Sequence, residues 1–238
     1  MGIIVVSGTG TEIGKTVVTS AVAAAAVAAG RSVAVLKPAQ TGVAPGEPGD
    51  VAEVARLAGG AVTGVELVRY PEPLAPERAA LRAGMATVSP EEVADAARKL
   101  AAGHDLVLVE GAGGLLVRFD AAGHTLADTA RLLGAPVLVV APAGLGTLNS
   151  ATLTGEALRA RGITQLGVVV GSWPAAPDLA ARCNLADLPV AAQAPLLGAV
   201  PEGAGALAPE AFRAAAAGWL APELGGAWAA DAFLTAWA

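Results

Sequence analysis

Two lysines of this sequence stand at positions where a charged amine could do chemistry. Lysine is scarce, since the 15 basic residues include only Lys15, Lys37 and Lys99. Lys15 closes a glycine-rich run, and Lys37 follows a short apolar run at residues 32–36. A lysine ammonium is a compact point charge that suits a small oxyanion better than the planar fork of arginine does. Both lysines are therefore candidates for binding negatively charged oxygens.

The glycine-rich run is residues 8–16, GTGTEIGKT, and it has the features of a phosphate-binding loop. It lies between an apolar run at residues 3–7 and a segment of helical period, the setting that such a loop needs. Backbone N–H groups would surround phosphate oxygens, and the helix N-terminus would add its positive dipole end. Lys15 is expected to reach the outer phosphates, and the Thr16 hydroxyl to bind Mg²⁺. The run has five residues between its first glycine and Gly-Lys where the common pattern has four, so a ligand-free turn is the alternative.

Two carboxylates could complete a magnesium site beside this loop. Glu110 closes the apolar run at residues 106–109, in the manner of a metal-binding acid of a P-loop enzyme. Asp50 follows a Gly/Pro-rich loop at residues 41–49 and opens a helical pattern. With the Thr16 hydroxyl, they would offer Mg²⁺ three hard oxygen ligands. Simpler roles stay open, because Glu110 could cap a turn and Asp50 could be a helix N-cap.

Two more segments follow predicted strands, where the ligands of a parallel sheet gather. Lys37 comes after residues 32–36, and Pro38 is expected to end that strand; a solvated strand-end lysine is the alternative. Residues 144–149, GLGTLN, come after residues 136–140 and open a helix that Thr147 could cap. The free N–H groups at that helix end could bind a carboxylate or a phosphate, although a plain capped helix explains the pattern equally well.

The elements that would position these residues alternate along the chain. Strand candidates occupy residues 3–7, 32–36, 106–109, 136–140 and 166–170, with a weaker one at 196–200. Helical patterns lie at roughly 14–29, 50–58, 90–102, 126–133, 148–161 and 178–187. Strands that are apolar on both faces and separated by helices predict an α/β fold, with a parallel sheet covered on both sides and right-handed crossovers. Residues 203–238 follow no clear pattern and could hold a docking helix or be partly mobile.

Composition narrows the class of protein. A chain of 238 residues with 54% apolar residues is expected to form one large domain. A net charge of −6 without a Lys/Arg stripe argues against a nucleic-acid partner. The apolar stretch at residues 17–29 is short for a membrane span, and the uncharged start is unlike a secretory signal. The single cysteine, Cys183, fits a reducing compartment, so a cytoplasmic protein is expected.

Taken together, the motifs resemble those of the dethiobiotin synthetase family. The matching stretches are GTGTEIGKT (8–16), KPAQTG (37–42), VEGAGGLLV (109–117), GLGTLN (144–149) and, more weakly, LLGAVP (196–201). They span most of the chain in one order, and their combination is far more specific than a phosphate loop alone. The resemblance implies a three-layer P-loop NTPase fold, with a mostly parallel central sheet flanked by helices, in a single domain over residues 1–238.

The resemblance also implies a reaction. In this family ATP, CO₂ and 7,8-diaminopelargonate give dethiobiotin, ADP and phosphate. One amine captures CO₂ as a carbamate, the γ-phosphoryl group of ATP activates it as a mixed anhydride, and the second amine closes the ureido ring. Lys37, together with Lys15, would be catalytic, and Mg²⁺ would be held by Thr16, Asp50 and Glu110.

Binding residues carry over in the same way. The resemblance assigns the nucleotide and its metal to Glu12, Ile13, Gly14, Lys15, Thr16, Val17, Asp50, Glu110, Gly111, Ala112, Gly113, Gly171, Ser172, Pro201, Glu202 and Gly203. It assigns the diamine or its carbamate to Thr11, Thr41, Gly146, Thr147, Leu148 and Asn149. Family members are homodimers in which the equivalent of residues 144–149 reaches the neighbour's site, so a homodimer with a shared active site is implied.

The sequence departs from the family at several positions. Gly10 stands where many members have aspartate, Ser172 where many offer an asparagine to adenine, and Gly144 where some have a basic residue. Serine lacks the separate amide donor and carbonyl acceptor of asparagine, which leaves selectivity for ATP over other nucleotides open.

Two other kinds of P-loop protein share parts of the pattern. A cobyrinate or cobyrate amidation enzyme would carry a glutaminase domain with a nucleophilic cysteine, for which 238 residues leave no room. A ParA/MinD-like switch, which binds partners by nucleotide-driven dimerisation, usually has a second lysine in its phosphate loop, and residues 9–13 contain none. Membrane-targeting switches also end in a basic amphipathic helix, whereas residues 231–238 contain no basic residue.

Overall fold

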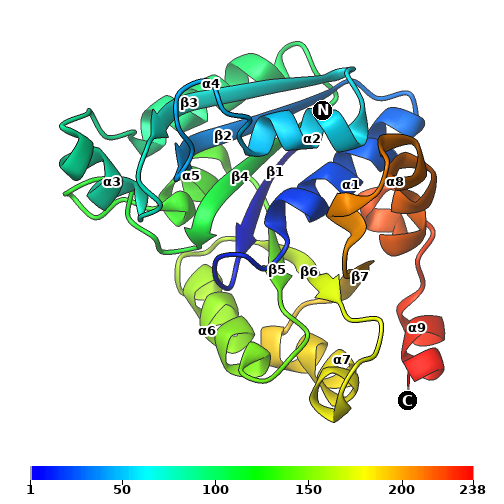
Figure 1. The fold of residues 1–238 in the computed structure, drawn as a ribbon. Coiled ribbons are helices and arrows are strands. Elements are labelled where there is room, and N and C mark those ends of the chain that lie inside the picture. Colours follow the sequence, from blue (N-terminus) through cyan, green and yellow to red (C-terminus); the bar gives the residue numbers. More distant parts are fainter. Residues whose placement is uncertain (1, 238) are drawn as a thin grey trace.

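The computed structural model describes residues 2–237, which form a seven-stranded sheet with helices on both faces (Figure 1). The strands are β1 (Gly2–Gly8), β2 (Val33–Thr41), β3 (Val62–Tyr70), β4 (Leu106–Gly114), β5 (Val137–Ala141), β6 (Gln165–Trp173) and β7 (Leu196–Pro201). Every strand pair is parallel, and the order across the sheet is β3-β2-β4-β1-β5-β6-β7. The predicted α/β architecture is confirmed, and the described sheet is entirely parallel.

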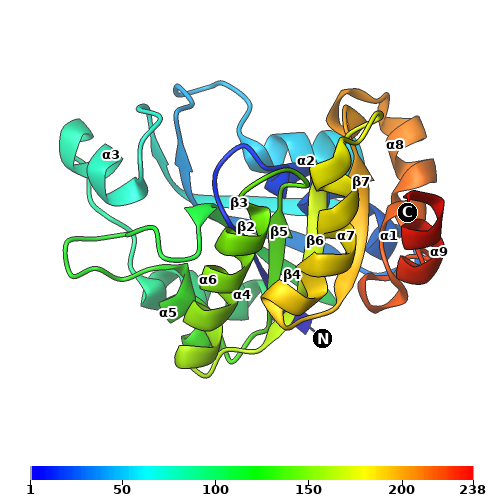
Figure 2. The same ribbon diagram turned by 90° about the horizontal axis from the view of Figure 1, so that it is seen from below.

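Helices cover the sheet in two groups (Figures 1 and 2). One face carries α1 (Lys15–Ala28), α2 (Asp50–Ala58) and α8 (Pro209–Ala216), which pack against one another. The other face carries α4 (Pro90–Ala101), α5 (Leu126–Leu133), α6 (Thr147–Ala160) and α7 (Leu179–Ala192), packed as the pairs α4 with α5 and α6 with α7. Two further helices, α3 (Pro76–Ala83) and α9 (Ala230–Trp237), lie at the periphery.

The core is built from small and branched apolar side chains. The central strands are buried on both faces, as Val5, Val107 and Val139 illustrate with no exposed surface. Burial of such side chains from both sides supplies the main favourable free energy of folding. The alanine-rich stretch of α1 lies against the sheet, where side chains without bulk allow a close approach. Within residues 2–237, no helix is both long enough and apolar enough to cross a membrane.

The centre of the sheet determines where a ligand can bind. β1 lies between β4 and β5, and the chain leaves β1 toward β2 on one side and returns through β5 on the other. The order of strands therefore reverses beside β1, and ligands of open α/β sheets bind at such a switch point, beyond the carboxyl ends of the strands. The phosphate loop follows β1 there, between the ends of β4 and β5, and the end of β2 lies next to that of β4 (Figure 1).

Two features of the fold differ from the sequence-based expectation. β3 was not predicted, because it is an edge strand that pairs only with β2 and its pattern is broken by Gly64, Glu66 and Arg69. Pro38 does not end β2, which continues to Thr41. Its pairing with β4 stops at Leu36, so beyond that point β2 is paired only with β3, the setting of an edge strand, in which proline is tolerated.

The C-terminal region is folded in the described structure. α8 packs on α1 and α2 through the buried Phe212, which also meets Trp219 edge-on at 5.2 Å between ring centroids. Short 3₁₀ turns cover Ala204–Ala206, Ala217–Trp219 and Pro222–Leu224. α9 places Phe233 and Trp237 against Trp173 of β6, with centroid distances of 5.4 and 5.6 Å. Of the two expectations for this region, the docking helix is the one confirmed.

Candidate active site

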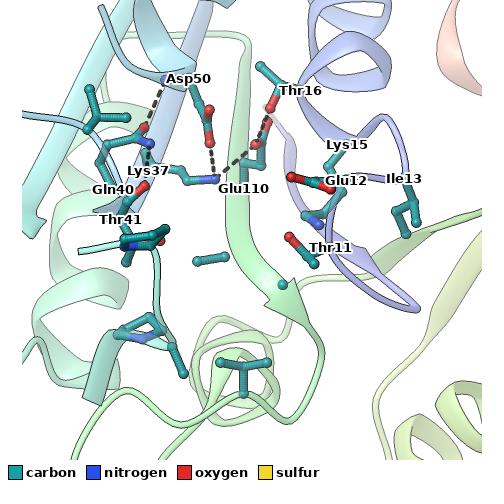
Figure 3. Close-up of a pocket in the computed structure, with 18 of the residues that line it drawn as sticks. Thr11, Glu12, Ile13, Lys15, Thr16, Lys37, Gln40, Thr41, Asp50 and Glu110 are labelled. Atoms are coloured by element: carbon teal, nitrogen blue, oxygen red, sulfur yellow. Dashed lines mark hydrogen bonds and ion pairs between the residues drawn. The ribbon is translucent and has the colours of Figure 1, made fainter. Parts of the chain in front are cut away.

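A cavity of about 920 Å³ opens at the carboxyl ends of β1, β2 and β4, and we call it the main cavity (Figure 3). Its walls are the phosphate loop, the end of β2, the first turn of α2, the end of β4 and the segment before α3. The predicted site residues that line it are Thr11, Glu12, Ile13, Gly14, Lys15, Thr16, Val17, Lys37, Thr41, Asp50, Glu110, Ala112 and Gly113. Residues from distant parts of the sequence thus converge as expected.

The phosphate loop depends on glycine where it meets β6. Gly14 is the N-cap of α1 with a φ of 90°, a left-handed conformation that side chains disfavour. A Cβ atom at Gly14 would lie 2.3 Å from the Gly171 carbonyl oxygen, and one at Gly171 would lie 2.0 Å from the Ile13 carbonyl oxygen. Gly171 was predicted to bind nucleotide, and its visible role is this close contact with the loop.

A buried ion-pair network lies at the centre of the main cavity (Figure 3). The Lys37 ammonium is 2.5 Å from Asp50 Oδ2 and 3.0 Å from Glu110 Oε1, and it also donates to the Gly111 carbonyl oxygen at 3.1 Å. The Thr16 hydroxyl donates to Glu110 Oε1 at 2.9 Å. Lys37 is 3% exposed and Glu110 is 1% exposed. These positions exclude a solvated lysine and a turn-capping glutamate.

Asp50 is also more than a helix cap. Gly49 is the N-cap of α2 and has no side-chain cap, so Asp50 is the first helical residue and its carboxylate turns toward Lys37. The N–H of Asp50 donates instead to the side-chain oxygen of Gln40 at 2.8 Å. The N-cap alternative is therefore wrong, and Gln40 holds the helix end that presents this carboxylate.

The two cavity lysines have opposite electrostatic surroundings. Burial alone would lower the pKa of Lys37, but the charges of Glu110 and Asp50 outweigh it, so the pKa of Lys37 is raised from its ordinary value. The pKa of Lys15 is lowered, first by burial and second by repulsion from Lys37, against the weaker attraction of the carboxylates. The Lys15 ammonium donates to the Gly10 carbonyl oxygen of its own loop at 2.7 Å. Lys37 is thus a firmly held cation, whereas Lys15 has no carboxylate partner within the described ion pairs.

The predicted metal ligands fit a Mg²⁺ ion. Thr16 bonds to Glu110, Asp50 and Glu110 share the Lys37 ammonium, and all three line the main cavity. Glu110 Oε2 is buried without a hydrogen-bond partner among the described residues. A buried carboxylate oxygen without a partner is costly unless a ligand satisfies it. Within residues 2–237, no group of three His, Cys, Asp or Glu side chains is placed to hold a metal ion. Two carboxylates and a hydroxyl would leave the remaining ligands to phosphate and water, as Mg²⁺ prefers.

Other predicted nucleotide residues lie at a smaller cavity. Ser172 and Glu202 line a space of about 290 Å³ beyond the ends of β6 and β7, which we call the second cavity. Gly144 and Asp178 line the same space. Pro201 pairs with Trp173, and Gly203 follows in a left-handed turn, so neither lines either cavity.

The segment 144–149 is not part of the main cavity of its own chain. Gly146, with a φ of 88°, is the N-cap of α6, and Thr147 is the first helical residue with no capping bond. The expectation that Thr147 caps this helix is therefore wrong. The Thr147 hydroxyl is buried without a partner among the described residues. None of Gly146, Thr147, Leu148 and Asn149 lines the main cavity.

Sequence reasoning missed part of the cavity wall. Gln40 lines the main cavity and accepts from the Asp50 N–H, and its place within KPAQTG is the signal that could have identified it. The apolar lining from Val43, Val117 and residues 73–76 had no signal, because single apolar residues in loops follow no period. Gly42, with a φ of 73°, approaches Pro73 so closely that a Cβ atom would lie 2.9 Å from the proline ring, which holds this wall against the end of β2.

Comparison with known proteins places the chain among similar sequences and folds. A family model described as an AAA domain matches residues 3–209. ATP-dependent dethiobiotin synthetases are 71% identical in Streptomyces avermitilis, over 99% of both chains, and 69% identical in Streptomyces coelicolor, over 98% of both chains. The protein of the same name from Rhodococcus jostii is 60% identical over 92% of this chain and 94% of its own.

Solved structures of similar fold have much lower sequence identity. A ParA family ATPase from Chlorobium tepidum has a TM-score of 0.58 and 12% identity, over 94% of both chains. The MinD protein of Pyrococcus horikoshii in complex with Mg-ADP has a TM-score of 0.55 and 17% identity, over 91% of this chain and 94% of that one. At such identities the likeness concerns the fold alone.

Proposed function

The chain belongs to the ATP-dependent dethiobiotin synthetase family, and from this premise we propose that ring closure takes place in the main cavity. Membership makes it a ligase of biotin biosynthesis. The observation that carries the proposal is the convergence of the phosphate loop, Lys37 and Glu110 in one space. A ligase that phosphorylates a carbamate needs an ATP cradle and positive charge for the transferring oxygens beside each other.

Lys37 is the proposed catalytic residue. Its ammonium lies across the cavity from the phosphate loop, as Figure 3 shows, and it is held by two carboxylates in a buried position. A cation fixed before the reaction stabilises developing negative charge without reorganising, which is the main source of electrostatic catalysis. Lys15 would bind the outer phosphates once it leaves the Gly10 carbonyl oxygen.

Thr16, Asp50 and Glu110 are the proposed ligands of Mg²⁺. When bound, the ion would supply charge neutralisation to the phosphate oxygens. The chain prepares for it by holding Glu110 beside Lys37 and by leaving Glu110 Oε2 without a hydrogen-bond partner within the described contacts. Replacement of Glu110 by glutamine should raise the Mg²⁺ concentration needed for half-maximal turnover about tenfold, the effect of losing roughly one charge-assisted contact. An unchanged Mg²⁺ titration would remove Glu110 from the metal site.

The two cavities suggest how the substrates are arranged. The diamine would lie against Thr11 and Thr41, with its aliphatic chain along the apolar wall at residues 73–76. The nucleobase would extend past Gly171 toward the second cavity, where Ser172 and Glu202 would contact it. Selectivity for the nucleobase would then depend on the residues that line this second cavity.

We also propose a homodimer in which each active site uses residues 144–149 of the other chain. Leu145 is 88% exposed and Leu153 of α6 is 57% exposed, and exposed large apolar side chains favour burial against a partner. The same segment does not line the main cavity of its own chain, so a role in substrate binding requires another copy. The N–H groups at the start of α6 would bind the substrate carboxylate.

Complementation tests this shared site. Lys37→Ala should remove most turnover and leave nucleotide affinity within about threefold, because the phosphate loop is intact. Asn149→Glu adds an anion to the exposed first turn of α6 and should repel the substrate carboxylate. Co-expressed together, the two inactive proteins should recover about a quarter of wild-type activity, since random pairing leaves one intact site in each mixed dimer. No recovery would contradict the shared site.

The ParA/MinD-like switch is the second candidate, since solved structures of that group have a similar fold. Relatives of about 70% identity over nearly the whole chain favour the ligase. Hydrolysis that responds to DNA or lipid, and not to the diamine, would favour the switch. A cytoplasmic site of action remains part of the proposal and is consistent with the single cysteine.

A further inference from the structure

Asn184 of α7 is a buried polar residue that the reaction described above does not use. It is 6% exposed, and its side-chain amide donates two hydrogen bonds, to the carbonyl oxygens of Ala143 at 2.8 Å and Gly144 at 3.0 Å. An asparagine amide has two N–H donors, so both are used. Ala143 and Gly144 belong to the loop between β5 and α6, and the contact therefore joins α7 to the segment that opens α6.

We propose that Asn184 is a positioning residue that holds residues 144–149 in the geometry with which they bind the substrate carboxylate. The inference rests on the proposed function of that segment. The Gly144 carbonyl oxygen that accepts from Asn184 also accepts from the Thr147 N–H at 3.3 Å, at the first residue of α6. Asn184 therefore determines the position of the first turn, whose N–H groups lack intrahelical acceptors.

The surroundings explain why this loop needs an external support. Gly144 and Gly146 flank the strongly exposed Leu145, and glycines lose more conformational freedom on ordering than other residues. The Thr147 hydroxyl is buried at the helix start without a partner among the described residues. A loop with two glycines and a buried unsatisfied hydroxyl needs a neighbour that limits its conformations.

α7 is attached to α6 independently of Asn184. The Thr152 hydroxyl donates to the Ala191 carbonyl oxygen at 3.2 Å, and Arg159 donates to that of Ala192 at 3.3 Å. Both acceptors lie at the C-terminal end of α7, away from Asn184. Loss of the Asn184 amide should therefore loosen the start of α6 and leave the packing of the two helices in place.

The test compares two substitutions at this position with a control on the same helix. Asn184→Leu keeps the side-chain size and removes both donors, and Asn184→Asp keeps the shape but places a carboxylate against two carbonyl oxygens. Asp187→Asn is the control, because Asp187 is exposed on α7 and makes no hydrogen bond or ion pair within the described contacts. Melting temperatures identify the variants that are folded, and having two substitutions keeps the test valid if one of them does not fold.

The Michaelis constants for the diamine and for the nucleotide should respond differently to these substitutions. KM for the diamine should rise about tenfold in both Asn184 variants, the factor for roughly one buried hydrogen bond. KM for the nucleotide should stay within about twofold, and Asp187→Asn should match the wild type. Hydrogen exchange should accelerate at the amides of residues 144–149. A merely structural role would lower stability without separating the two constants.

Two results would overturn the inference. One is an unchanged diamine KM in a folded Asn184 variant. The other is a rise of the nucleotide KM instead, which would assign the loop to the second cavity that Ala143 and Gly144 also line. A diamine with a methyl group in place of the carboxylate tests the underlying function separately. If the wild type binds this analogue as well as the natural diamine, the carboxylate role of residues 144–149 fails; if it discriminates while Asn184→Leu retains the natural KM, only the role of Asn184 fails.

Discussion

Lys37→Met should destabilise the protein in the absence of any ligand, because it leaves two carboxylates without their cation. The ammonium is 2.5 Å from Asp50 and 3.0 Å from Glu110, and only Asp50 reaches water, with a side chain 33% exposed. Removing one partner of a buried ion pair costs ~3–5 kcal/mol, and the partial hydration of Asp50 argues for the lower end, about 3 kcal/mol. Methionine fills the space of the lysine stem, so little of this loss would come from a cavity.

A double-mutant cycle with Glu110→Gln isolates the interaction. Glu110→Gln alone should cost about 1–2 kcal/mol, since Lys37 keeps Asp50 as a partner. In the Lys37→Met background the same change removes an unpaired charge, so the two effects should be non-additive by about 2 kcal/mol. Urea unfolding followed by circular dichroism, without Mg²⁺ and nucleotide, gives the four free energies.

An exposed ion pair provides the matched control. Arg98 and Asp95 lie on α4, with side chains 54% and 67% exposed. Loss of this ion pair in Arg98→Met should change the free energy of unfolding by less than about 0.5 kcal/mol. Arg98 also donates to the Leu132 carbonyl oxygen, and loss of that bond would add to the change. The prediction would be contradicted if Lys37→Met lowered the free energy of unfolding as little as this control does, or if the effects of the two substitutions in the cycle were additive. Either result would mean that the buried network does not form in the free protein.

Three further predictions concern pH, the phosphate loop and the C-terminal helix. The pKa of Lys37 in the folded protein is raised above its ordinary 10.5. The charged Lys37 therefore contributes fully to stability below pH 10.5, and this contribution is lost as pH rises through the pKa of the folded state. In urea titrations, the difference in the free energy of unfolding between wild type and Lys37→Met should narrow above pH 10.5. Gly171→Ala would place a Cβ atom 2.0 Å from the Ile13 carbonyl oxygen and should weaken nucleotide binding at least about tenfold by calorimetry, whereas Gly103→Ala, with open space around it, should not. Phe233→Ala removes an edge-on contact with Trp173, so it should lower the free energy of unfolding by about 1–2 kcal/mol and speed proteolysis of the C-terminal helix. Thr235→Ala on the same helix should have neither effect.

Much of the site could be predicted because its residues follow strands that are apolar on both faces. Such strands are recognisable in sequence, and the carboxyl ends of neighbouring parallel strands must meet at one edge. The sequence therefore predicts that Glu110, within β4, and Lys37, within β2, face one crevice. The ion pairs of Lys37 then exclude the alternative roles of Asp50 and Lys37. Local sequence could not separate these alternatives, since a helix-opening aspartate has the same pattern in both roles.

Other features depend on neighbours that a local pattern does not contain. β3 alternates polar and apolar residues irregularly because it is an edge strand, and Pro38 is tolerated because β2 is paired only with β3 beyond Leu36. α9 has no fully buried residue and is held by aromatic contacts with Trp173, which lies far away in sequence. In each case tertiary contacts, and not intrinsic propensity, determined the structure.

The most direct test of the central claim is the fate of labelled carbon. Wild type and Lys37→Met would be incubated with Mg-ATP, diaminopelargonate and ¹³C-bicarbonate, and the products analysed by mass spectrometry. The wild type should form labelled dethiobiotin, and only when nucleotide is present. Lys37→Met should form almost none, although that variant still binds ATP. Consumption of ATP by the wild type without labelled product, or full labelling by the variant, would contradict ring closure at Lys37 in the main cavity.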